Sequence, residues 1–142
     1  MRLKYQTCGA LVVALLLAGC TSPPDKPPAT NALPACGWLP NCVNSQSGRG
    51  VHATEPLRGT GEDWKNLKAW ILRQEDWEIT VDDGNFLQAV VTTPVMRFRD
   101  DVQLLFVPDE HLIQVRSSSR LGVSDLGTNA RRVETLREQL SQ

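Results

Sequence analysis

The run from Arg116 to Arg132 is the densest stretch of residues that can do chemistry in this 142-residue chain. Arginine binds carboxylate and phosphate groups through paired N–H donors, and the serines and asparagine nearby add further hydrogen-bonding groups. The candidate residues are all polar: Arg116, Ser117, Ser119, Arg120, Asp125, Asn129 and Arg132. Such a set predicts either a site for an anion or a partner protein, or an internal lock that fixes the fold.

The two interpretations assign different partners to the same charged residues. In the first, Arg116 and Arg120 bind an anion beside the first turn of the last helix, where free N–H groups and the helix dipole favour negative charge. In the second, Asp125 pairs with one of these arginines, and Asn129 ties the turn to the segment 36–42. A buried pair of this kind fixes geometry without binding a ligand. The sequence leaves both interpretations open.

An envelope enzyme is the alternative function. A serine nucleophile needs a nearby base, and His52 or Asp101 are the candidates. The pair Asp100–Asp101 is, however, more typical of a β-bulge or a solvated bend. We therefore expect a binding or structural module with no catalytic residue, no bound metal and no cofactor.

An amphipathic helix is the first regular element expected ahead of this stretch, over residues 61–74. Trp64, Leu67, Trp70 and Ile71 recur at helical spacing and form one apolar stripe. Thr60 and Asp63 have the spacing of a capping box at its start.

Four strands are expected next. They are 77–81, 86–93, a third strand made of 95–98 and 102–107 with an interruption at 99–101, and 111–117. Residues 82–85 read as a hairpin turn around Gly84. A last helix is expected over 131–140, and Thr128 or Asp125 can cap it. The order predicts an α+β domain: a four-stranded antiparallel meander sheet with two helices packed on one face, preceded by a disordered tether.

The N-terminus has the pattern of an export signal. Arg2 and Lys4 precede the apolar run Leu11–Ala18, which is too short to span a bilayer as a mature helix. The sequence Leu17-Ala18-Gly19-Cys20 that follows resembles the bacterial lipobox. The resemblance implies cleavage before Cys20 and acylation of that cysteine, which anchors the chain to a membrane.

This pattern divides the chain into a signal peptide at 1–19, a lipidated cysteine with a proline-rich linker at 20–35, and a globular domain at 36–142. Thr21 follows the lipidated position, where Asp usually directs retention in the inner membrane. The resemblance therefore implies the outer membrane, with the domain facing the periplasm.

Two cysteines remain for the mature domain, Cys36 and Cys42. In an oxidising compartment they are expected to form a disulfide. A zinc site that adds His52 and His111 is the less favoured alternative, since the spacing of the cysteines does not fit the usual hook. A redox-active pair is also less favoured, since the Cys-x-x-Cys spacing is absent.

The net charge of -1 argues against nucleic acid as a partner, because such binding depends on neutralising phosphates. The expected partners are instead the membrane, through the lipid anchor, and an envelope protein or an anionic ligand.

Motifs in three places resemble one known family. They are Pro40-Asn41-Cys42-Val43 with Ser45; Asp100-Asp101-Val102; and Val115-Arg116-Ser117 continued by Ser119-Arg120, Gly122, Asp125, Gly127 and Asn129. The chain from about residue 36 onward is similar to the family catalogued as domain of unknown function 1499, small proteins of bacteria and plastids, many with signal peptides. The family often has Ser at position 44 and Arg at position 130, where this chain has Asn44 and Ala130. If the family's arginine at position 130 has a role, Arg131 or Arg132 would have to perform it in this chain. The resemblance implies no agreed activity.

Overall fold

The structure is a computed structural model that describes residues 31–142. The predicted signal peptide, the lipidation site Cys20 and most of the expected linker lie outside the described residues. Within residues 31–142, no helix combines the length and the apolar composition that a membrane span requires.

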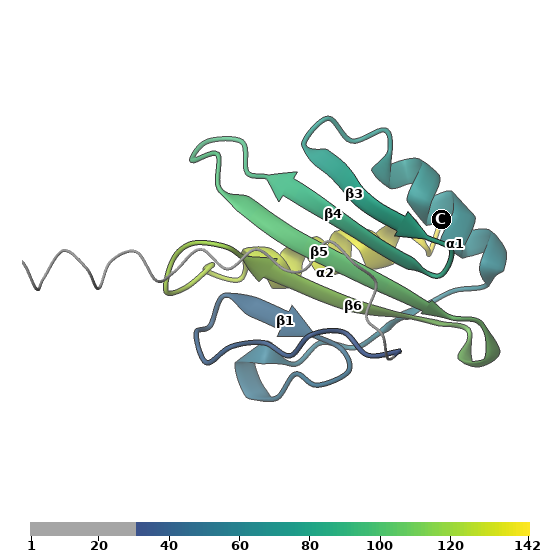
Figure 1. Cartoon of the computed structure of the whole chain (residues 1–142), viewed down its shortest axis with the longest axis horizontal. Helices are drawn as coiled ribbons and strands as arrows, with labels where there is room; N and C mark the ends of the chain where they lie inside the picture. Colours follow the sequence, from purple (N-terminus) through teal and green to yellow (C-terminus); the bar gives the residue numbers. More distant parts are fainter. Residues whose placement is uncertain (1–30) are drawn as a thin grey trace, which may run out of the picture.

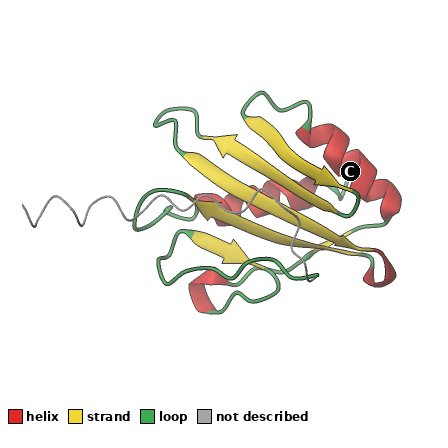
Figure 2. Cartoon of the chain, viewed as in Figure 1, coloured by secondary structure: helices red, strands yellow, loops and turns green. Residues whose placement is uncertain are grey.

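Four consecutive antiparallel strands form most of the sheet, with the first of them at one edge (Figures 1 and 2). They are β3 (Trp77–Asp83), β4 (Phe86–Thr92), β5 (Arg99–Val107) and β6 (Leu112–Ser119). Each pairs with the next along the chain, so the expected meander and α+β class are confirmed. Gly84 has φ 58° in the turn between β3 and β4, which supplies the left-handed backbone that the hairpin requires.

The predicted number of strands was wrong, because the sheet of the described chain has six strands. The additional strands are β1 (Cys42–Asn44) and β2 (Leu57–Arg58), which both pair antiparallel with β6. Both precede residue 61, where we expected the first regular element to begin. A short 3-10 helix, η2 (Gly50–His52), lies between them, and another, η3 (Pro108–Glu110), joins β5 to β6.

The third predicted strand also needs a correction. Its expected interruption at residues 99–101 is the beginning of β5, whereas residues 93–98 form a loop. Asp100 and Asp101 are 1% and 2% exposed, on opposite faces of the strand. Each carboxylate has an arginine partner, which explains how both remain within a buried strand.

Helix α1 (Gly61–Ile71) begins as predicted and ends three residues earlier. The side chain of Thr60 accepts a hydrogen bond from the Asp63 N–H, and the Asp63 carboxylate accepts one from the Thr60 N–H, so the capping box is confirmed. These bonds lower the pKa of Asp63, the backbone N–H contributing most. Trp64, Leu67 and Ile71 are buried, as their spacing predicts.

Replacing Thr60 with alanine is expected to lower the free energy of unfolding by about 1 kcal/mol, because an exposed N–H group of α1 loses its side-chain acceptor. Urea unfolding followed by circular dichroism measures this loss. Thr135→Ala, an exposed position within the last helix, is the control and should change stability less. A Thr60→Ala variant as stable as the parent would contradict the capping role.

The last helix, α2 (Thr128–Gln139), and α1 pack on the same face of the sheet. Their buried side chains, including Leu67 from α1 and Leu136 from α2, share one core with Val102 and Leu104 of β5. The opposite face has a smaller apolar cluster, in which Leu33 covers Phe86 and Leu105. The core therefore lies between the sheet and the two helices.

The predicted disulfide between Cys36 and Cys42 is confirmed. It closes a short loop directly before β1, and Asn41 within this loop contacts the chain beyond β6. The loop therefore joins the start of the domain to its last loop and helix.

Replacing both cysteines with alanine is expected to lower the free energy of unfolding by about 2 kcal/mol, because the unfolded chain regains the freedom that the closed loop removes. Urea unfolding of the oxidised parent and the double variant measures the difference. Adding a reductant should shift the parent towards the variant and leave the variant unchanged. Equal stability of parent and variant would refute the prediction.

Candidate functional site

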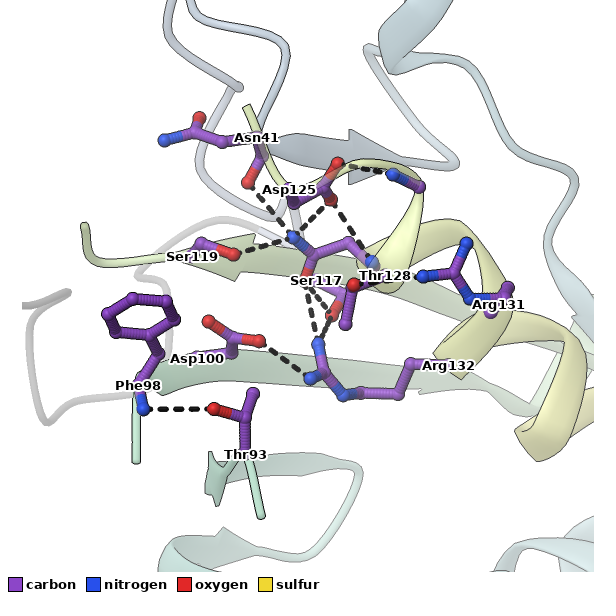
Figure 3. Close-up of polar contacts among 12 residues, drawn as sticks. Asn41, Thr93, Phe98, Asp100, Ser117, Ser119, Asp125, Thr128, Arg131 and Arg132 are labelled. Carbon is purple, nitrogen blue, oxygen red and sulfur yellow. Dashed lines mark hydrogen bonds and ion pairs between the residues drawn. The ribbon is translucent and has the colours of Figure 1, made fainter. Parts of the chain in front are cut away.

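Asn129, in the first turn of α2, is the centre of a polar network between α2 and the sheet (Figure 3). Its amide nitrogen donates to the Asn41 carbonyl, the Ser119 hydroxyl and the Asp125 carboxylate, at 2.6–3.0 Å. Its amide oxygen accepts from Ser117 and Arg132. The side chain is fully buried, and both ends of the amide are occupied.

A buried ion pair between Arg132 and Asp100 continues this network. One guanidinium nitrogen of Arg132 donates to Asp100 Oδ2 at 2.6 Å, and another donates to Ser117 and Asn129. The two charged side chains are 8% and 2% exposed. Because neither ion is well solvated, each depends on the other for compensation of its charge. The pair fixes α2 against β5.

Asp125 does not pair with an arginine, contrary to the structural interpretation of the sequence. Its carboxylate accepts from the backbone N–H groups of Gly127 and Asn129 and from the Asn129 amide. The acid therefore satisfies donors at the beginning of α2, where the helix dipole favours negative charge. Gly127 itself adopts φ 80°, which glycine does without strain.

The other two candidate arginines lie on the opposite face of the sheet. Arg120 makes two hydrogen bonds to Asp101, at 2.7 and 2.9 Å. Arg116 donates to Gln103 at 3.4 Å. Burial lowers the pKa of the Arg116 guanidinium, and the charge of Asp101 opposes this shift. The structure thus brings Ser117, Ser119, Asp125, Asn129 and Arg132 together but separates Arg116 and Arg120 from them.

The two candidate bases for catalysis also have other partners. His52 Nδ1 lies 2.9 Å from the Cys42 carbonyl, and Asp101 accepts from Arg120. Among the described residues, neither side chain has a recorded hydrogen bond to a serine. Residues 31–142 also contain no group of three or more His, Cys, Asp or Glu side chains placed to hold a metal ion.

A cleft that the sequence did not reveal lies beside this network. We call it the loop cleft: it lies between the β4–β5 loop (residues 93–98) and the segment 119–128. Asp100 and Arg131 also line it, and its volume is about 440 Å³. This is within the range of small-molecule sites. Val95 and Phe98 belong to its wall, although we assigned them to a strand. Pro94 was the only sequence signal that separated these residues from a strand.

Local hydrogen bonds hold both walls of the loop cleft. In the β4–β5 loop, Thr93 and Phe98 exchange two hydrogen bonds, and the Arg97 N–H donates to the Thr93 carbonyl. In the other wall, the Asn41 amide donates to the Gly122 carbonyl. The disulfide loop and the polar network therefore position the cleft.

The fold and these contacts define a small α+β domain whose polar network supports an apolar cleft between two loops. The chain belongs to the family described as "Protein of unknown function (DUF1499)", which it matches over residues 32–140. No curated protein and no solved structure matches the chain.

Proposed function

We propose that this chain is a lipoprotein of the outer membrane, anchored through Cys20, whose domain is a non-catalytic binding module on the periplasmic face. The lipobox resemblance of residues 17–20 supports the anchor, and the family membership supports the extent of the domain. The anchor keeps the module at the membrane surface.

The observation that carries the binding role is the loop cleft. Its walls expose apolar side chains to solvent, with Val95 88% and Leu126 85% exposed. Contiguous exposed apolar surface on a soluble domain typically marks a binding site. The arginines Arg132 and Arg120, by contrast, already pair with Asp100 and Asp101, on opposite faces of the sheet. In this proposal the polar network stabilises the fold around the cleft, and the cleft binds the ligand.

Photocrosslinking in intact cells tests the binding role. A photoreactive amino acid replaces Leu126 in the cleft wall or, as the matched control, Leu72 at the end of α1, which is 72% exposed. We expect a discrete adduct of constant mass from position 126 and none from position 72. Equal or absent adducts at both positions would refute the binding role.

Metabolic labelling with a radioactive fatty acid tests the anchor separately. We expect the label on the parent chain and on Cys8→Ala, but not on Cys20→Ala, with the labelled protein in the outer-membrane fraction. An unlabelled parent, or label that survives Cys20→Ala, would refute the anchor without affecting the test of the cleft.

A further inference from the structure

We propose that the loop cleft binds a neutral amphiphile: an apolar chain with a terminal hydroxyl group, whose O–H donates to Asp100 Oδ1. This inference rests on the proposed binding function and names the class of its ligand.

The first observation is the state of the Asp100 carboxylate. Asp100 is 1% exposed, and its Oδ2 accepts from Arg132. Its Oδ1 is also buried and has no hydrogen-bond partner among residues 31–142. Figure 3 shows this second oxygen on the side of Phe98 and Ser119, away from Arg132. An unmet buried acceptor costs about 1–3 kcal/mol, so a ligand that donates a hydrogen bond here recovers that cost.

The second observation is the apolar wall of the cleft. Met96 and Leu126 are 65% and 85% exposed, so a ligand that covers them removes apolar surface from water. Leu126 also has φ 51°, a left-handed conformation that is unfavourable for leucine. Leu126 thus combines a strained backbone with an exposed apolar side chain beside the cleft. Residues with strained backbone conformations concentrate at ligand-binding positions.

The third observation is the charge balance, which selects a neutral head group. Asp100 is paired with Arg132, and the wall contains one further carboxylate, Asp125, and one further guanidinium, Arg131. A cationic head group at Asp100 would meet the arginines, and an anionic one would meet the carboxylates. A hydroxyl group adds no charge and supplies the missing donor.

Labelling of the full chain with photoreactive probes tests the proposal. The probe is an alkyl alcohol of roughly ten carbons, a length suited to a cleft of this size, with a diazirine in the chain. The matched controls have the same chain with a carboxylate or a trimethylammonium head group. We expect the alcohol to label residues 93–98 and 119–128 about tenfold more than either control, which corresponds to about 1.4 kcal/mol.

The labelling is repeated with the alcohol free in solution and with it embedded in phosphatidylglycerol–phosphatidylethanolamine vesicles. Labelling from solution identifies a soluble amphiphile as the source, and labelling only from vesicles identifies a membrane lipid. Either result supports the proposal. Equal labelling by the three head groups, or labelling outside the two segments, would overturn it.

Two variants make the test independent of folding. Leu126→Asp adds a charge beside the cleft, and Asp tolerates the left-handed backbone, so the fold should be unaffected. It should reduce alcohol labelling about tenfold, whereas Leu72→Asp should leave it unchanged. A discrete adduct in cells without alcohol labelling would disprove the ligand class and leave the binding role standing.

Discussion

Replacing Arg132 with methionine is expected to lower the free energy of unfolding by about 3–5 kcal/mol. Within the described residues, the Arg132 guanidinium is the only hydrogen-bond donor to the Asp100 carboxylate, and both groups are buried. Removing one ion leaves the other without compensation, and the Asn129 and Ser117 side chains also lose a donor. Urea unfolding monitored by tryptophan fluorescence measures the loss.

Arg131→Met is the matched control, because Arg131 is the adjacent residue of α2 and is exposed. Its hydrogen bonds to the Leu126 carbonyl and the Thr128 hydroxyl lie at the surface, so its loss should cost less than about 1 kcal/mol. The double variant Arg132→Met, Asp100→Leu should recover part of the stability, because it removes both charges. Similar losses for the two arginine variants would contradict the role of the buried pair.

Replacing Asn129 with aspartate is expected to cost about 3 kcal/mol at pH 7, although the side chain hardly changes in shape. The amide nitrogen that donates to Asp125, Ser119 and the Asn41 carbonyl becomes an oxygen that cannot donate when ionised. The nearby charge of Arg132 favours ionisation of the new carboxyl, but Asp100 already compensates that charge. The like charge of Asp125 and the burial of the site should therefore dominate and hold the pKa of the new carboxyl above its usual range.

This variant should therefore have a distinct pH dependence. With a raised pKa in the folded state, the folded protein holds the proton at pH values where the unfolded chain has lost it. The variant should be most stable below about pH 4 relative to the parent, and its deficit should grow as the pH rises through the folded pKa. Unfolding from pH 3 to pH 8 measures this trend. Asn66→Asp, on the exposed surface of α1, should show no comparable deficit, and a pH-independent deficit at position 129 would exclude the charge mechanism.

Much of the fold was predictable because its signals are local. The apolar stripe of Trp64, Leu67 and Ile71 located α1, and the alternation at residues 77–81 and 111–117 located the first and last strands of the meander. The strands β1 and β2 were not predictable, since two or three residues are too few to show a period. They exist because the edge of β6 offers hydrogen bonds to chain segments that are close only in the folded protein.

The candidate site was predictable in its residues but not in its pairing. Asp100 and Asp101 suggested a bend because two buried acids are costly in a strand, and their compensating arginines lie far along the chain. Asp125 was expected either to pair with an arginine or to cap the last helix; its carboxylate accepts from the Gly127 and Asn129 N–H groups at the start of α2. The cleft escaped prediction because exposure is a property of the folded surface: Val95 and Phe98 have the composition of a strand, and only the loop geometry leaves them outside the core.

The contact between the Asn41 carbonyl and the Asn129 amide joins positions 88 residues apart in the sequence. During synthesis, the segment around Asn41 is made long before α2. Its hydrogen bond to Asn129 can form only after α2 has been made. A contact of such sequence separation forms late and slowly. The network around Asn129 therefore cannot be completed until α2 has been synthesised.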